Sequence, residues 1–374
     1  MRTIHRELLA ALLACLLGAT FAPLRAATAE CPDLSALQPI PAATSPRTTA
    51  QLEADRIVAQ VQAAITAGLS DIVLAKAIAD YEEALRIDPG NAPAHLHLAR
   101  AHLQSQRYLS VPVDRAHARA FEHLAKGRAI DPGNITGLQV LADEAFLRTL
   151  DYGCARRILD TAQRLAPDDA TTHRLLAELL SGMGEFALAF EHADRALALS
   201  EGVTRRNILL NQGRPRYMAG QYDWVLDHYA TFLAANPGAG LAHFYRSLAF
   251  GAKGDVEQAL VEAKLAQPQA PVGDAGGIAM LAMAYANAGR EKEARELLGE
   301  LLGRDARGEH VVEYRIAAVY EALGERDAAL DWLDREIADR NGLGSWLLWL
   351  NQDPAWKALR TDPRFEDIQR RSGW

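Results

Sequence analysis

A glycine recurs at an almost constant interval through the second half of the chain. The five positions are Gly184, Gly220, Gly254, Gly289 and Gly324, which lie 36, 34, 35 and 35 residues apart. Each glycine opens the same kind of turn into a helix, and a period of this length is typical of stacked helical hairpins. The interval therefore predicts an all-α fold built from one repeated helix-turn-helix unit.

Each part of this unit has a physical cause. A glycine ends the first helix because a residue without a Cβ adopts the left-handed conformation at almost no cost. Five residues later a small side chain lets the two antiparallel helices approach closely, and these residues are Ala189, Val225, Ala259, Ala294 and Ala329. A proline then closes most second helices; the prolines are Pro89, Pro132, Pro167, Pro237 and Pro271, with Glu201 in that slot of one repeat.

The segment Tyr81 to Pro89, Tyr-Glu-Glu-Ala-Leu-Arg-Ile-Asp-Pro, resembles the second helix and exit of a tetratricopeptide repeat. The resemblance extends from about residue 51 onward and implies a right-handed α-solenoid, a scaffold that serves many functions. We expect eight hairpins, at about 51–90, 92–133, 135–168, 170–202, 204–238, 240–272, 275–305 and 308–340. The second is lengthened around residues 107–113, where we expect either a loop or an extended helix end.

The first 29 residues have the pattern of a secretory signal peptide. Arg2 and Arg6 precede an apolar run from Leu8 to Leu17, and Ala27-Thr-Ala29 provides a small-x-small cleavage site. Cationic, apolar and small-residue regions in this order are typical of export signals. We therefore expect an exported protein, either periplasmic or secreted, with a mature chain that begins near residue 30.

A second interpretation of the same segment is a lipoprotein signal, because Leu12-Leu-Ala-Cys15 resembles a bacterial acylation site. Acylation of Cys15 would tether the protein to a membrane. Removal of residues 1–29 takes away three arginines and one glutamate, so the formal net charge changes from −8 to −10. An acidic chain binds nucleic acid or an anionic membrane surface poorly. No stretch of the mature chain is apolar over the roughly 20 residues that a membrane span needs.

The mature chain keeps two cysteines, Cys31 and Cys154. Exported proteins meet compartments in which disulfides persist, so a bridge between the two is one interpretation. The alternative is that Cys154 is a small buried packing residue and Cys31 is unpaired. Residues 30–50 contain four prolines and have the composition of a flexible linker before the array of residues 51–340.

The last residues, 341–374, depart from the repeat and are rich in aromatic side chains, among them Trp346, Trp349 and Trp356. This stretch resembles the C-terminal ends of tetratricopeptide arrays in bacterial signalling proteins, although no output activity follows from that likeness. We expect it to form a helical cap whose tryptophans cover the open face of the last repeat.

Motifs for catalysis or for a cofactor are absent from the sequence. It contains no nucleophile elbow, phosphate-binding loop, paired-cysteine metal spacing or zinc-protease motif. His95, His97 and His102 cluster, but His95, His173 and His243 share one repeat position, which favours packing between helices over metal binding. We therefore predict neither enzyme activity, nor a cofactor, nor a metal site.

The inner surface of the solenoid is where we expect function, because stacked hairpins leave their first helices lining a groove. Arginines there can form bidentate contacts with a carboxylate, and paired asparagines can bond a peptide backbone. Helical spacing directs these side chains to the groove: Arg100, Gln139, Asp143, Arg174, Glu178, Asn207, Asn211, Arg214, Tyr217, Phe244, Tyr245, Met283 and Tyr314.

The sequence thus predicts a non-catalytic adaptor that binds a protein segment, either a peptide or a partner helix, in its groove. Two alternatives remain open at this point. The aromatic C-terminus could dock onto another copy in a self-assembling structural subunit, or a hydrolytic site could lie around the segment from His95 to His102.

Overall fold

The computed structural model divides the chain into two units, residues 1–33 and residues 34–374. It describes residues 31–38, 46–109, 111–266, 275–309, 311–339 and 345–374. The predicted signal peptide, including Cys15, lies outside the described residues. In the described part every regular element is a helix, and none of these helices is both long and apolar enough to cross a membrane.

The helices of the second unit pair in chain order into the eight predicted hairpins. The pairs are α2 (Thr49–Ala67) with α3 (Asp71–Ile87), α4 (Ala92–Leu109) with α5 (Val113–Ile130), α6 (Ile135–Leu147) with α7 (Tyr152–Leu165), α8 (Ala170–Gly182) with α9 (Phe186–Ala198), α10 (Gly202–Asn211) and α11 (Gly213–Met218) with α12 (Tyr222–Ala235), α13 (Gly240–Ala252) with α14 (Val256–Ala266), α15 (Ala275–Asn287) with α16 (Glu291–Ala306), and α17 (Glu313–Ala322) with α18 (Arg326–Asp339).

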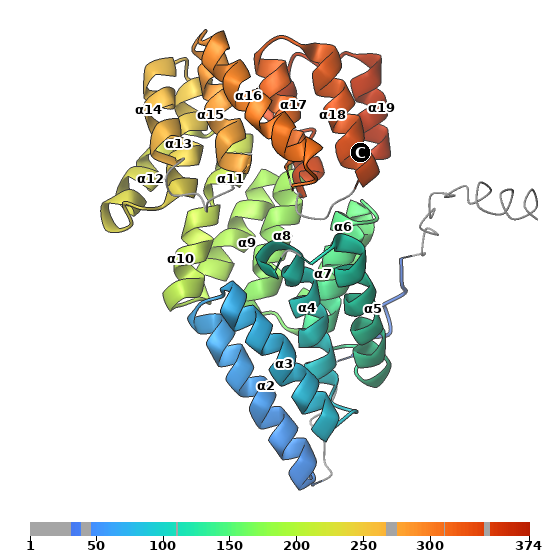
Figure 1. The fold of residues 1–374 in the computed structure, drawn as a ribbon. Helices are drawn as coiled ribbons and strands as arrows, with labels where there is room; N and C mark the ends of the chain where they lie inside the picture. Colours follow the sequence, from blue (N-terminus) through green and yellow to red (C-terminus); the bar gives the residue numbers. More distant parts are fainter. Residues whose placement is uncertain (1–30, 39–45, 110, 267–274, 310, 340–344) are drawn as a thin grey trace, which may run out of the picture. The chain divides into compact units, whose positions relative to one another are not determined.

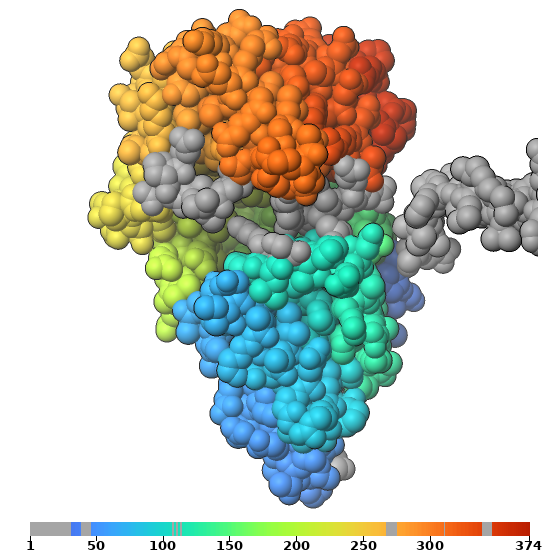
Figure 2. Space-filling model, in the orientation of Figure 1, coloured from blue at the N-terminus to red at the C-terminus, as the bar shows by residue number. Residues whose placement is uncertain are grey.

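The first helices of successive hairpins contact one another and form what we call the inner layer. Contacts join α2 to α4, α4 to α6, α13 to α15 and α15 to α17. The array is strongly curved, since α10 of the fifth hairpin also contacts α2 of the first (Figure 1). In the space-filling view the first two hairpins, in blue and teal, meet on the visible face, and so do the last two, in orange and red (Figure 2).

The turns inside the hairpins follow the predicted chemistry. The five recurring glycines have φ values of 79°, 72°, 83°, 69° and 79°, the left-handed region that a Cβ disfavours. The five small residues that follow them are at most 4% exposed. In the third hairpin Leu150 adopts φ 55° without a glycine, a conformation that costs about 1–3 kcal/mol in a residue with a side chain.

The Asp-Pro-Gly-Asn exits end one helix and begin the next. The Asn91 side chain accepts a hydrogen bond from the backbone N–H of Ala94 at 2.9 Å, and Asn134 accepts one from Thr136 at 3.0 Å. An asparagine at this position satisfies a backbone donor that the first turn of a helix leaves unpaired. Proline stops the old helix, and asparagine starts the new one.

The lengthened second hairpin has extended helix ends rather than a long loop. Its helices α4 and α5 each have 18 residues, whereas α8 and α9 of the fourth hairpin have 13. The additional residues thus prolong the hairpin along its own axis.

The first helix of the fifth hairpin is interrupted between α10 and α11. The Tyr229 hydroxyl donates to the Leu210 carbonyl at 2.7 Å and accepts from the Gly213 N–H at 2.9 Å. A Cβ on Gly213 would lie 2.2 Å from that hydroxyl oxygen, so only glycine fits. Pro215 follows, which has no N–H to continue the helical bonding. Arg214 directly follows the interruption, and its side chain contacts Tyr245 and Trp346.

The chain ends in what we call the tail, residues 345–374. It consists of η2 (Ser345–Trp349), η3 (Pro354–Trp356) and α19 (Pro363–Arg371). Helix α19 packs on α18 and η3 on α17, as expected of a cap, but η2 contacts α6 and α8. The tail therefore reaches back across the inner layer to the third and fourth hairpins.

Residues 34–38, within the predicted linker, also contact the array. Leu34 is buried, and the Leu37 carbonyl accepts a hydrogen bond from Arg164 at 3.1 Å. Cys31 and Cys154 are both disulfide-bonded, and Cys154 is 5% exposed. That the two cysteines pair with each other stays a prediction.

Candidate binding pocket on the inner layer

A chain of charged and amide side chains runs along the inner layer from α4 to α8. Arg100 donates to the Gln139 side-chain oxygen at 2.5 Å. The Gln139 amide in turn donates to Asp169 at 2.6 Å and to the Thr172 hydroxyl at 2.8 Å. Because Gln139 is only 1% exposed, these bonds hold its amide inside the protein. Gln139 is thus a structural link between neighbouring hairpins.

Asp143 extends this chain of charges. Its burial raises the pKa to about 6, although Arg100 and Arg174 oppose the rise by favouring the charged form. Burial likewise lowers the pKa of Arg100. Removing a charge from water is costly unless a partner compensates it, so the two groups depend on each other.

Farther along, two arginines share one carboxylate. Arg174 of α8 lies 3.6 Å from Glu178, and Arg214 of α11 lies 3.7 Å from the same side chain. Within 4 Å, one carboxylate therefore serves both arginines, and Arg174 also acts on the charge of Asp143. These three residues leave a net charge of +1 at this point of the inner layer.

The three residues line a cavity of about 490 Å³. Its walls come from α8, α9, the α10–α11 region and the tail. Among the residues that the structure describes, the lining is Arg174, Ala177, Glu178, Ala193, Ala196, Thr204, Asn207, Ile208, Asn211, Gln212, Arg214, Pro215, Trp346 and Trp349. We call this cavity the inner pocket. It brings together five of the predicted groove residues: Arg174, Glu178, Asn207, Asn211 and Arg214.

The wall formed by the tail is held by arginines. The ring of Trp346 lies 4.2 Å from the guanidinium carbon of Arg214 and 4.0 Å from that of Arg315. Arg214 also donates to the Tyr245 hydroxyl at 2.9 Å, and Arg315 lies over Phe244 at 4.3 Å. Contacts between a cation and an aromatic face are worth about 0.5–2 kcal/mol each. Together they fix the indole of Trp346 at the edge of the inner pocket.

Close contacts with glycines hold the adjoining part of the tail. A Cβ on Gly182, at the end of α8, would lie 2.2 Å from Leu348. A Cβ on Gly184 would lie 2.9 Å from the Gln352 amide nitrogen. Leu348 is 1% exposed, so the absence of a side chain on α8 makes room for a buried leucine of the tail.

The final residues of the chain dock on the turn of the third hairpin. The ring of Trp374 lies 4.7 Å from that of Tyr152, and its indole N–H donates to the Leu347 carbonyl at 3.1 Å. A Cβ on Gly373 would lie 2.1 Å from the carbonyl oxygen of Leu150. Leu150, whose backbone adopts the left-handed conformation, therefore contacts the C-terminal residues.

The tail also continues the core of the last hairpin. The Trp356 indole N–H donates to the Tyr314 hydroxyl at 2.6 Å, and that hydroxyl donates to Asp353 at 2.9 Å. Trp356 is fully buried and Trp349 is 1% exposed. Burial raises the pKa of Asp353, against the effects of its backbone hydrogen bond and of nearby Arg315.

The other predicted groove residues lie outside the inner pocket. Arg100, Asp143 and Met283 are half-buried. Those that are at most 7% exposed are Gln139, Tyr217, Phe244, Tyr245 and Tyr314. Their side chains point inward, as the helical spacing predicts. Phe244 and Tyr245, however, contact arginines, and Tyr314 contacts Trp346 of the tail.

Sequence reasoning missed the tail's contribution to the pocket. The sequence predicts Trp346 and Trp349 to lie in the cap, and it gives no reason to single out Thr204 or Gln212. Repeat spacing does not place a tail that lies outside the repeat. One signal for the docking is Gly182, an additional glycine two residues before the turn glycine, which is buried at the end of α8.

A family model described as "Tetratricopeptide repeat" matches residues 74–108, which span α3 and α4. This segment therefore matches one tetratricopeptide repeat, and the other hairpins repeat its helix-turn-helix arrangement. Arrays of such hairpins present concave surfaces to protein partners in general. No curated protein sequence is similar enough to count as a relative.

Solved structures resemble this array at low sequence identity. The array matches the APC/C hetero-tetramer Cut9–Hcn1 with 17% identity and a TM-score of 0.51, over 86% of this chain and 56% of that one. It thus spans little more than half the length of that protein. PilW, a type IV pilus biogenesis factor, matches with 19% identity and a TM-score of 0.47, over 57% of this chain and 94% of that one. A tetratricopeptide repeat protein from Parabacteroides merdae matches with 12% identity and a TM-score of 0.43, over 86% and 99%.

Proposed function

We propose that this tetratricopeptide array is a non-catalytic interaction scaffold whose inner pocket holds a short acidic segment of a partner protein. The observation that carries the proposal is the pair of arginines, Arg174 and Arg214, that share the single carboxylate of Glu178. A carboxylate from the partner would supply the missing negative charge. Arginine suits this task because its planar guanidinium can donate two parallel hydrogen bonds to a carboxylate.

The size of the pocket favours a short segment over a partner helix. A volume of about 490 Å³ is within the range of sites that enclose small ligands. An α-helix with its side chains is about 10–12 Å wide, and the tail already covers the inner layer beside the pocket. Of the two predicted occupants, a peptide and a partner helix, we therefore propose a peptide of a few residues in extended form.

The amides of the pocket suit an extended backbone. Asn207 and Asn211 both line the cavity, and Asn211 uses one amide hydrogen on the Asn207 carbonyl at 2.8 Å. An asparagine side chain has a second amide hydrogen and an acceptor oxygen. These are the groups with which a peptide backbone pairs.

Arg174 is the residue to test, because Arg214 also has a structural role. The Arg174 side chain is 46% exposed, whereas that of Arg214 is 20% exposed and contacts Trp346. Reversing both charges would disturb the docked tail as well as the pocket. Arg195 of α9 is a matched control, because its side chain is 49% exposed and pairs with Asp168 outside the pocket.

The experiment uses two pools of fluorescein-labelled hexapeptides, one rich in Asp and Glu and the other with Asn and Gln at the same positions. Fluorescence anisotropy should show tighter binding of the acidic pool to the unmodified protein. Arg174→Glu should lower the affinity for this pool at least tenfold, and Arg195→Glu should leave it unchanged. Equal binding of the two pools, or equal losses in the two variants, would refute the proposal.

Self-assembly through the aromatic tail is not proposed. The indoles of Trp349 and Trp356 are buried against the array of their own chain, and Trp346 lies between two arginines. Docking onto another copy would first require these contacts to break.

A further inference from the structure

Two hairpins contain a pair of histidines in the same arrangement. In the second hairpin, Nδ1 of His95 lies 2.9 Å from Nδ1 of His123. In the fourth, Nδ1 of His173 lies 2.8 Å from Nδ1 of His192. The first member of each pair belongs to the inner layer and the second to the partner helix of the same hairpin. This arrangement occurs twice, so it belongs to the repeat rather than to one accidental contact.

The inner histidine of each pair is oriented by a backbone carbonyl. His95 Nε2 lies 3.1 Å from the Pro89 carbonyl oxygen, and His173 Nε2 lies 2.8 Å from that of Pro167. A carbonyl only accepts hydrogen bonds, so Nε2 carries the proton and donates it. The Nδ1 atom of the neutral ring is then an acceptor aimed at the second histidine.

We propose that each histidine pair binds one transition-metal ion, with Zn²⁺ as the representative, between its two Nδ1 atoms. Zn–N bonds of about 2.0–2.1 Å in tetrahedral geometry place two nitrogens roughly 3.4 Å apart. To admit the ion, the rings need to separate by about half an ångström and to turn so that both lone pairs converge on it. A carbonyl that accepts from the other ring nitrogen is the usual support of a metal-bound histidine, and the inner histidine of each pair has it.

Ligation needs neutral rings with both Nδ1 atoms unprotonated, so the outer histidine of each pair must move its proton from Nδ1 to Nε2 when the ion binds. Burial lowers the pKa of His95 and His192, and it lowers that of His123 to about 4 with a further contribution from His95. All three are neutral at pH 7. The outer histidines, His123 and His192, are half-buried, whereas the inner ones are at most 6% exposed. An ion would therefore enter from the outer side.

Charged neighbours distinguish the two pairs. Glu122 and Lys126 influence both His95 and His123, and Arg119 acts on the nearby His102. Asp160, Glu191 and Arg156 influence His192. The second pair has two carboxylates against one cation, so it should bind a dication more tightly. No point among the described residues gathers three or more His, Cys, Asp or Glu ligands, so water must complete each coordination shell.

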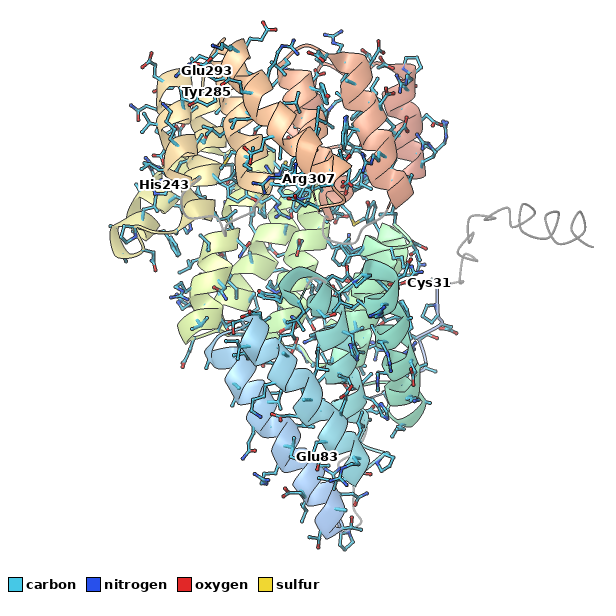
Figure 3. The ribbon with its side chains drawn as sticks, viewed as in Figure 1. Cys31, Glu83, His243, Tyr285, Glu293 and Arg307 are labelled. Carbon is cyan, nitrogen blue, oxygen red and sulfur yellow. The ribbon has the colours of Figure 1, made fainter. Side chains whose placement is uncertain are left out.

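The sixth hairpin provides an internal comparison. His243, labelled in Figure 3, is the fourth residue of its helix, as His95 and His173 are of theirs, but Glu262 replaces the second histidine, 2.6 Å from Nδ1 of His243. Arg246 donates to the other oxygen of Glu262, also at 2.6 Å. Because the charge of Glu262 is already balanced by Arg246, this hairpin should not bind the ion.

The test is equilibrium dialysis of the full chain, free of any affinity tag, against Zn²⁺. Two ions per chain are expected. His123→Asn and His192→Asn should each reduce the number to one, and the double variant to zero, whereas His243→Asn should leave it at two. Asparagine is chosen because its amide can still hydrogen-bond to the remaining imidazole.

Nitrogen NMR of the unmodified protein provides a second readout, should a variant fail to fold. Zn²⁺ should shift the Nδ1 resonances of the four paired histidines and leave that of His243 in place. No shift at these positions, or a number of bound ions that is the same in all variants, would overturn the proposal.

Discussion

The crossings inside the hairpins and the surface beneath the tail both depend on small residues, but over different distances in sequence. At the crossings, alanines such as Ala294 and Ala329 lie five residues after a turn glycine and are fully buried between adjacent helices. Beneath the tail, Gly182 of α8 admits Leu348 from the far end of the chain. The first arrangement is repeated in hairpin after hairpin, whereas the second joins two particular segments.

This difference separates a local from a global source of stability. A crossing holds one hairpin together, and a solenoid in which each unit contacts only its neighbours tends to fray at its ends. The tail instead joins the last hairpin to the third and fourth. We therefore expect substitutions beneath the tail to affect the whole array, and those in the outer helices to remain local.

The largest expected effect is that of Trp356→Ala. This indole is fully buried in the tail and hydrogen-bonds to Tyr314, and truncating a buried tryptophan costs about 3–5 kcal/mol. Urea unfolding should show that loss. The matched change, Trp224→Ala, removes a half-buried indole of the outer helix α12 and should cost less. Equal losses in the two variants would remove the distinction between the two regions.

Asp143→Asn tests the charged part of the inner layer. Because burial raises the pKa of Asp143 to about 6, the folded protein holds this proton more tightly than the unfolded chain, whose pKa is about 3.9. The free energy of unfolding should fall by up to about 3 kcal/mol as the pH rises from about 4 to about 6, and then level off.

The measurement compares urea unfolding of the unmodified protein and of Asp143→Asn at pH 4 and at pH 7. In the variant, the free energy of unfolding should not fall through titration of this carboxyl. The difference in free energy of unfolding between the two proteins should therefore change between pH 4 and pH 7. A constant difference across the range would contradict the assigned burial of the carboxyl.

Gly182→Ala tests the close contact between α8 and the tail. Its Cβ would lie 2.2 Å from Leu348, and overpacking of this kind costs about 1–3 kcal/mol. Tryptophan fluorescence should report the displacement of Trp346 and Trp349 together with the loss of stability. A fully stable variant with unchanged emission would show that the tail does not depend on this glycine.

The smallest effect, of opposite sign, is expected for Gly299→Ala in the outer helix α16. A Cβ at this position meets nothing within 4 Å, and alanine restricts the unfolded chain more than glycine does. The variant should be more stable by about 0.4–1 kcal/mol, as measured by urea unfolding. Destabilisation would show that the outer helices are as sensitive to added volume as the surface beneath the tail.

Repeat spacing predicted the inner pocket only in part. Arg174 and Glu178 lie four residues apart on one helix, and so do Asn207 and Asn211, so helical geometry alone sets their common direction. The position of Arg214 required more, because the interruption at Gly213 depends on a hydroxyl from Tyr229. That contact joins two helices and has no local signature.

The sequence by itself determined the hairpins, because their causes act within about 35 residues: turn glycines, small crossing residues, closing prolines and capping asparagines. Only the tertiary structure decided where the tail lies and which groove residues remain open to a partner. Docking of Trp346 or Trp374 depends on the summed curvature of many hairpins, which brings distant residues together. No local pattern encodes that sum, because each repeat contributes only a small rotation.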